Sequence, residues 1–223
     1  SDPISITPLF STRQVQAVQQ TILTRTSSVA ASGNEPLLYV LMLRHADPAA
    51  TVQDIDVTAN DQPMQLLQTS HGTGFQQSVY WIDPALISPG PVTFSATNNT
   101  GNFNGTYLSG AAEVANAKVN QSGALVDKQG ASGVSQSRSV GVTTARANSA
   151  IVAMGTTFHE ITTKAGFDAL VEDGLAGIGN TVTFAAWGYH IQSSAGAASF
   201  TLAHTEGAQP FPAMALEIIH KAA

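Results

Sequence analysis

The stretch LLYVLML, Leu37–Leu43, decides the fold class because every one of its positions is apolar. Successive side chains of a β-strand point to opposite faces of the sheet, so a strand with one wet face alternates apolar and polar residues. A strand without polar positions is covered on both faces. Leu37–Leu43 therefore predicts a central strand between two packed layers.

Turn signals recur about every ten residues on both sides of this strand. Asn34–Glu35–Pro36 and Ser88–Pro89–Gly90 are two examples, and the segments between such signals are rich in Val, Ile, Thr, Phe and Tyr. Residues alternate clearly in Thr21–Thr26 and Val92–Ala96, which is typical of strands with one solvent-facing side. This rhythm predicts an all-β sandwich or barrel.

The expected strands cover most of the chain. They are Ile4–Phe10, Thr21–Ala30, Leu37–His45, Thr51–Val57, Met64–Thr69, Gln76–Ile82, Pro91–Thr97, Gly105–Ala112, Ser135–Thr143, Ala150–Thr157, Thr181–Ile191, Ala197–His204 and Pro212–His220.

Two segments also fit helical spacing. Lys164–Leu175 places Phe167, Leu170, Val171 and Leu175 on one helical face, so it is the one short helix that we expect. The segment Arg13–Thr21 fits a short helix as an alternative to a strand.

A polar stretch rich in Gly and Ser, Asn116–Gly133, separates two strand-bearing halves. It is either an interdomain linker or a long loop within one sandwich. We favour the loop, because each half alone has few strands for a double layer. The prediction is one β-sandwich domain over residues 1–223, and no internal repeat of fixed period is visible.

Charge is scarce in this chain. It has nine Lys/Arg, fifteen Asp/Glu and no Cys, and 11% of its residues are charged against about 25% in a typical soluble domain. Disulfides and thiolate metal sites are excluded. A net charge of −6 without a basic run argues against nucleic-acid binding. No run approaches the roughly 18 apolar residues of a membrane-spanning helix, so we expect no membrane span.

The order of motifs resembles jelly-roll, concanavalin A-like β-sandwich domains of bacterial and phage surface proteins. The resemblance covers about Thr21–Ala112. The matching segments are the apolar strand Leu37–Arg44, the hairpin Thr51–Asn60, the aromatic-x-x-Pro motif Trp81–Pro84, the strand start Gly90–Phe94 and the glycine-flanked strand Gly105–Gly110. The sequence departs from the pattern at Ala85–Ser88 and at Asn60–Asp61. The resemblance implies the fold and carries no catalytic residue across.

Catalytic signatures are not found in the sequence. Gly130–Ala131–Ser132–Gly133 lacks the spacing of a nucleophile elbow. His159–Glu160 has no second His at the offset that zinc proteases need. We therefore expect no enzymatic activity.

Aromatic residues are the candidate ligand-binding residues, because sugars stack on exposed rings. The candidates are Tyr80–Trp81 and the cluster Trp187, Tyr189 and His190, in which Trp187 and Tyr189 share one strand face. The alternative is that these rings lie in the core, where large aromatics are usually found.

Asp54 and Asp56 alternate on one strand, and Asp61 follows just beyond the turn. Oxygen ligands at this spacing could hold calcium, whereas the alternative is a solvated polar face. We expect no cofactor, with calcium at these three residues as the one candidate.

The N-terminal segment, residues 1–10, reads as an edge strand flanked by Pro3 and Pro8. It either folds back onto its own sandwich or exchanges with a neighbouring copy. Asn98, Asn104 and Asn120 each begin an N-x-Ser/Thr glycosylation sequon.

These features lead to three functional hypotheses. The first is a non-catalytic, self-associating structural subunit of a virion or an extracellular surface, such as a capsid decoration, tail or filament protein. Its partners would be copies of itself or another structural subunit. The alternative is a carbohydrate-binding, lectin-like module, and the third hypothesis is a polysaccharide-active enzyme.

Overall fold

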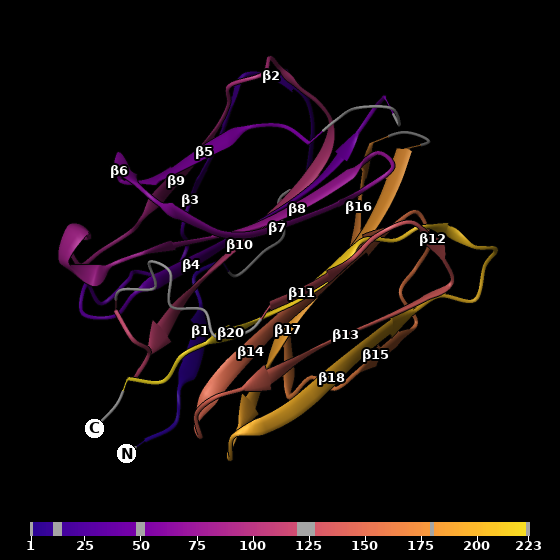
Figure 1. Ribbon diagram of the computed structural model, residues 1–223. Coiled ribbons are helices and arrows are strands. Elements are labelled where there is room, and N and C mark those ends of the chain that lie inside the picture. The colour runs from indigo at the N-terminus through magenta and orange to yellow at the C-terminus, as the bar shows by residue number, and fades with distance from the viewer. Residues whose placement is uncertain (1, 11–14, 48–51, 120–127, 179–180, 222–223) are drawn as a thin grey trace.

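The computed structural model describes residues 2–10, 15–47, 52–119, 128–178 and 181–221, and within them the protein is built of antiparallel strands (Figure 1). Their one helical element is the 3-10 turn η1 at Pro84–Leu86, which Asp83 caps by accepting a hydrogen bond from the Ala85 backbone N–H. The predicted all-β class is confirmed. In the same residues, no helix has the length and apolar character to cross a membrane.

The N-terminal half forms two sheets, which we call the inner and the outer N-terminal sheet. The inner sheet has the order β1 (Ser5–Pro8), β10 (Phe103–Ala115), β4 (Leu37–His45), β8 (Phe75–Ile82) and β7 (Gln65–Gly72), with β2 (Val15–Gln20) also paired to β10. The outer sheet has the order β3 (Ile22–Thr26), β9 (Thr93–Asn98), β5 (Ile55–Ala59) and β6 (Gln62–Pro63).

The C-terminal half likewise forms an inner and an outer sheet. The inner C-terminal sheet has the order β11 (Lys128–Ala131), β20 (Ala213–Ile218), β14 (Ser149–Thr157), β17 (Thr181–Gln192) and β16 (Ala169–Ile178). The outer C-terminal sheet has the order β13 (Ser137–Thr144), β18 (Gly196–Ala203) and β15 (Thr163–Ala165), and the short strands β12 (Val134–Ser135) and β19 (Gln209–Pro210) pair separately.

The two halves repeat one strand order. In chain order, β1-β10-β4-β8-β7 corresponds to β11-β20-β14-β17-β16, and β3-β9-β5 corresponds to β13-β18-β15. The strands β2, β6, β12 and β19 are additions to this plan. The order is compatible with a jelly roll in each half. This repeat is not visible in the sequence, because the two halves share the way their strands are connected and not a regular spacing of similar residues.

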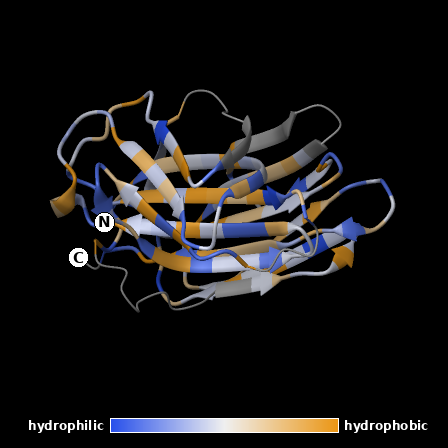
Figure 2. Cartoon of the chain, turned by 90° about the horizontal axis from the view of Figure 1, so that it is seen from above, coloured by the Kyte–Doolittle hydropathy of each residue, from blue (hydrophilic) through white to orange (hydrophobic). Residues whose placement is uncertain are grey.

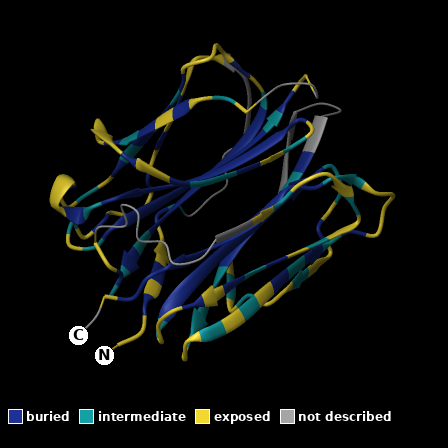
Figure 3. Ribbon diagram, viewed as in Figure 1, coloured by how far each residue is buried: buried dark blue, intermediate teal, exposed yellow. Residues whose placement is uncertain are grey.

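Four layers stack with apolar cores at the three interfaces between them, and the core of the C-terminal sandwich is divided into two clusters. The two inner sheets are the most buried (Figure 3). The strand β4 contributes to two of these cores. Its Leu38, Val40 and Met42 face the C-terminal half, whereas its Tyr39 and Leu41 face the outer N-terminal sheet. This arrangement explains why the stretch Leu37–Leu43 has no polar position.

Both halves contribute to the central core, which lies between the two inner sheets. The molecule is thus two stacked sandwiches, and the single domain over residues 1–223 stays a prediction. The stretch Asn116–Gly133 lies in part outside the described residues. Its described part includes Ala117, which bridges to His220, and β11, which joins the inner C-terminal sheet.

The helix expected at Lys164–Leu175 is wrong for the described residues, and the helical alternative for Arg13–Thr21 is not adopted in its described part. Lys164–Leu175 contains the end of β15 and much of β16. β16 has a register shift between Leu170 and Glu172; Leu170 is exposed, and Val171 packs on the central core. The apolar spacing of this segment fits a helix and an irregular strand alike. In Arg13–Thr21, the described part Val15–Gln20 is strand β2.

The N-terminal strand pairs within its own chain. Ser5–Pro8 pairs with Ala112–Ala115 of β10, and Ile4, Ile6 and Leu9 are buried in the core. The two termini lie close together, and the His220 ring Nε2 is 2.9 Å from the Asp2 carbonyl oxygen (Figure 1). Exchange of this strand with a neighbouring copy stays a prediction.

Candidate functional site

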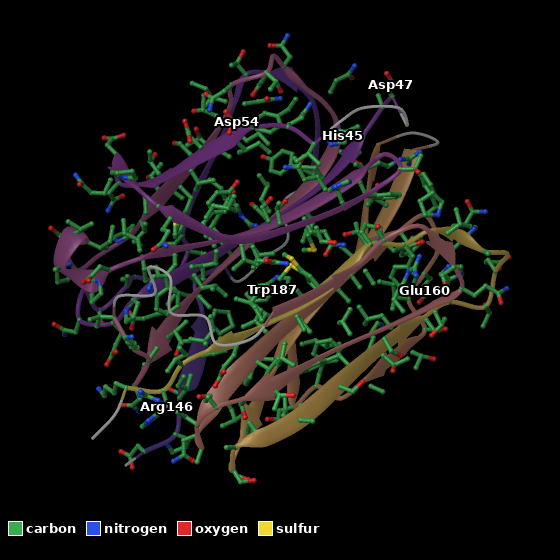
Figure 4. All side chains as sticks on the ribbon, viewed as in Figure 1. His45, Asp47, Asp54, Arg146, Glu160 and Trp187 are labelled. Atoms are coloured by element: carbon green, nitrogen blue, oxygen red, sulfur yellow. The ribbon has the colours of Figure 1, made fainter. Side chains whose placement is uncertain are left out.

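The predicted aromatic candidates lie mostly in the core. Trp187 and Trp81 pack in the central core, and Tyr80 packs between the two N-terminal sheets. Figure 4 shows Trp187 between the two inner sheets. Its indole packs directly over Gly110, where a Cβ atom would lie 2.7 Å from the Trp187 Nε1. Trp187 is 0% exposed, so its ring has no free face for a sugar.

Tyr189 and His190 lie on opposite faces of β17. Tyr189 shares the inward face with Trp187, as predicted, and packs half-buried against the central core. His190 is held on the other face, where its Nδ1 is 2.8 Å from Asp168 Oδ1 and its Nε2 is 2.9 Å from Gln192 Oε1. The room beside Gly188 is taken by Phe167, not by an open ligand site.

Asp168 fixes the segment before β16 onto β17. Its Oδ2 accepts a hydrogen bond from the Ile191 backbone N–H at 2.6 Å. Partial burial alone would raise the pKa of this carboxyl group. The hydrogen bonds from Ile191 and His190, together with the charge of His190, outweigh burial and hold the pKa of Asp168 below its usual range. The Asp168–His190 pair therefore connects the segment before β16 to β17 at the end of the C-terminal sandwich.

The three acidic candidates do not converge. Asp54 Oδ2 and Asp56 Oδ2 both accept from Asn99 Nδ2, at 3.4 and 2.9 Å. Asp61 has a φ of 64° and lies in the turn between β5 and β6. Among the described residues, no three His, Asp or Glu side chains are placed to hold a metal ion together. Calcium binding at these residues stays a prediction.

A groove opens at the edge of the N-terminal sandwich, between β5 of the outer sheet and β7 and β8 of the inner sheet. We call it the β5–β7 groove. Its volume is about 270 Å³, and Figure 4 shows Asp54 on its β5 side. The lining residues are Val52, Gln53, Asp54, Ile55, Leu66, Thr69, Gln76, Ser78 and Tyr80.

Side chains of β8 hold the β5 wall of the groove in place. Gln53 donates its backbone N–H to Gln76 Oε1 at 2.8 Å, and Gln76 Nε2 donates to the Gln53 carbonyl at 2.9 Å. The Tyr80 hydroxyl donates to the Ile55 carbonyl at 3.0 Å. The backbone groups of Gln53 and the carbonyl of Ile55 that face β8 therefore already have hydrogen-bond partners.

The hydroxyl of Tyr80 stays protonated over the physiological range. Burial raises its pKa to about 12, a hydrogen bond with Ser78 opposes this shift, and the negative charges of Asp56 and Asp54 add to it. The Thr69 and Ser78 hydroxyls lie 3.0 Å apart beside it. The groove is therefore lined by hydroxyl groups, two amide side chains, one carboxylate and aliphatic side chains.

Sequence reasoning named Tyr80 and Asp54 but did not place them at one groove. Three segments that are separate in the sequence form the groove, and only the pairing of strands into sheets brings them together. The available signal was the polar run Gln76–Ser78 in β8, a strand that is buried at every position. Such a run is unusual in a strand covered on both faces, where apolar residues are expected.

The sequons have different environments. Asn98 is 2% exposed, and its Oδ1 accepts from the Thr100 backbone N–H at 3.0 Å and from the Thr100 hydroxyl at 2.7 Å. Asn104 is exposed, and Asn120 lies outside the described residues.

Strand order and core together define the class of fold as an all-β protein of stacked, sandwich-like sheets. A scan of protein-family models finds no match to this chain. A search of curated proteins finds no significant match either.

Proposed function

We propose that this protein is a non-catalytic structural subunit that self-associates on a virion or an extracellular surface. The observation that supports the proposal is the chemistry of the two outer sheets, whose solvent faces carry hydroxyl groups and small side chains with almost no charge. Surfaces of this kind cost less to desolvate than charged surfaces do when they pack against a neighbour.

The outer C-terminal sheet has the most uniform face. Every outward residue of its described strands is Ser, Thr, Ala or Gly. These residues are Ser137, Ser139, Gly141 and Thr143 of β13, Ala197, Ser199, Thr201 and Ala203 of β18, and Thr163 and Ala165 of β15. The Ser139 and Thr201 hydroxyls lie 2.9 Å apart, so part of their hydrogen bonding is met within the sheet.

The outer N-terminal sheet has a similar hydroxyl-bearing face, to which Ile22 adds one exposed apolar side chain. Thr24 lies opposite Ser95 with their hydroxyls 3.3 Å apart, and Thr26 lies opposite Thr93 at 2.9 Å. Asp56 on β5 is the one charged residue among the outward positions of β3, β9 and β5. The strands mix hydrophobic and hydrophilic residues along their length, as expected when one face is buried (Figure 2).

Sedimentation velocity over a range of protein concentrations tests this proposal. The intact chain is expected to form oligomers, and the double variant Ser139→Lys/Ser199→Lys is expected to weaken them by about tenfold or more through like-charge repulsion across the contact. The matched control is Ser194→Lys, at an exposed position in the turn before β18.

An intact chain that stays monomeric at every concentration contradicts the proposal. An equal effect of Ser194→Lys contradicts the assignment of the contact to the outer C-terminal sheet.

No feature of the described residues favours the enzyme hypothesis as directly as the outer sheets favour self-association. The β5–β7 groove is an observation in favour of the glycan-binding hypothesis.

A further inference from the structure

We propose that the β5–β7 groove binds a neutral sugar ring. The proposal concerns a ligand site and does not depend on self-association. It replaces the predicted platform at Trp187, which is buried, with a groove at the edge of the N-terminal sandwich, where Asp54 is exposed and Gln53 and Thr69 are half-buried.

The groove is a local feature of the N-terminal half and not a consequence of the fold. In the C-terminal half, the corresponding strip between β15 and the pair β16 and β17 is occupied by Phe167. Its ring packs 4.9 Å from the ring of Phe200 and next to Gly188. In the N-terminal half the strip remains open between β5 and β7, because β6 pairs only with Thr58 and Ala59 at the far end of β5.

The groove is already organised before a ligand arrives. Gln76 is bonded to Gln53 through both its oxygen and its nitrogen, and Tyr80 is bonded to Ile55. A preformed wall reduces the entropic cost of binding. These same bonds occupy the edge of the β5 segment, so a peptide strand that paired with it would have to break them. The groove therefore suits a compact ligand rather than an added strand.

The groove offers a ligand a hydrogen-bond acceptor. The exposed Asp54 carboxylate has one long contact, 3.4 Å from Asn99 Nδ2. The Tyr80 and Ser78 hydroxyls are buried and already bonded, to the Ile55 carbonyl and the Thr69 hydroxyl, so Asp54 is the exposed acceptor of the groove. A ligand with several O–H donors satisfies such an acceptor, and vicinal hydroxyls of a sugar can donate to the two oxygens of one carboxylate.

The rim supplies an apolar contact for the other side of the ring. Leu66 is 48% exposed and Val52 is 40% exposed, and both line the groove. Aliphatic side chains can cover the C–H face of a pyranose. A volume of about 270 Å³ is just below that of most ligand pockets and suits one ring rather than an oligosaccharide.

The charge of the lining residues favours a neutral sugar over an anionic one. The described lining residues include Asp54 and neither Lys, Arg nor His. An anionic ligand such as sialic acid would lie beside a carboxylate without a cation to pair with it. A neutral hexose has no such penalty.

Saturation-transfer NMR on the intact chain tests the site. The probes are the methyl glycosides of galactose, glucose, mannose and N-acetylglucosamine, with sialic acid as the anionic comparison. At least one neutral glycoside is expected to bind, and Asp54→Asn and Leu66→Ala are each expected to weaken it by about tenfold. Both residues are exposed, and thermal unfolding checks that the variants fold.

Asp56→Asn is the matched control, because Asp56 shares the Asn99 contact with Asp54 but does not line the groove. Binding in this variant is expected to equal that of the wild type. The proposal is overturned if no neutral glycoside binds, if sialic acid binds better, or if both groove variants bind as well as Asp56→Asn does. The Ser139→Lys/Ser199→Lys variant is expected to retain sugar binding, which separates this test from that of self-association.

Discussion

His45 is a buried titratable residue at the end of β4. Burial lowers its pKa, and the charge of Asp47 acts in the opposite direction without restoring it. The folded state therefore favours the neutral ring more than the unfolded chain does. In the labelled view, His45 and Asp47 lie together at the end of β4 (Figure 4).

The sign of the resulting pH dependence follows by linkage. The depressed folded-state pKa of His45 contributes stability at pH values above the unfolded pKa of about 6.5, and this contribution is lost as the pH falls through the lower folded-state pKa. Urea unfolding between pH 8 and pH 5 is expected to show a smaller decline for His45→Gln than for the wild type. His71→Gln, at an exposed histidine, should leave the decline unchanged. Parallel curves for His45→Gln and wild type would contradict the prediction.

Gly110 is required by the ring of Trp187. A Cβ atom at position 110 would lie 2.7 Å from Nε1 and 2.8 Å from Cζ2 of that ring. Gly110→Ala is expected to lower the free energy of unfolding by about 1–3 kcal/mol through overpacking, measured by urea titration. Gly207→Ala is the control, because nothing lies within 4 Å of its Cβ position. Equal stability of both variants would show that the central core can yield at Trp187.

Among the elements, β4 and β16 show what the sequence could and could not predict. The bounds Leu37–His45 are those expected, because a strand covered on both faces has an uninterrupted apolar run. The segment Lys164–Leu175, which includes much of β16, was predicted as a helix because its apolar residues Phe167, Leu170 and Val171 are three and four positions apart. A single sequence does not distinguish an irregular strand from a helix by spacing alone.

The strand β1 is an edge element that carries core residues. Ile6 is buried, whereas its neighbour Thr7 is exposed. Ile6→Ala is expected to lower the free energy of unfolding by about 2–4 kcal/mol, because the buried side chain leaves a cavity. Thr7→Ala should change it by less than about 0.5 kcal/mol. Denaturant titration measures both, and an unaffected Ile6→Ala variant would indicate that β1 is not docked in solution.

At the scale of the whole molecule, the main feature is the stacking of two sandwiches of like strand order. This stacking could not be predicted from the succession of strands along the chain, because the connections and the packing of the cores determine which distant strands pair. The groove was missed for the same reason, since Val52, Leu66 and Gln76 come from separate segments. Composition did indicate the uncharged outer faces, because 11% charged residues leave few to distribute over them.

The shared central core predicts that neither sandwich is stable alone. Fragment 1–117 would expose Leu38, Val40 and Met42, and fragment 128–223 would expose Val152 and Leu216. Each fragment is expected to aggregate or to bind a hydrophobic dye, and mixing the two during refolding is expected to suppress both effects. Sedimentation and dye fluorescence provide the measurement. A soluble, monomeric fragment with cooperative unfolding would contradict this prediction.

The burial of Asn98 bears on how the protein can be produced. Oligosaccharides are attached to sequons on a chain that is still unfolded, whereas the folded protein encloses the Asn98 amide nitrogen without a partner. A glycan at that nitrogen would have to displace the inward face of β9 from the core. A eukaryotic secretory host that modifies Asn98 should therefore yield misfolded protein, while a bacterial host avoids this modification.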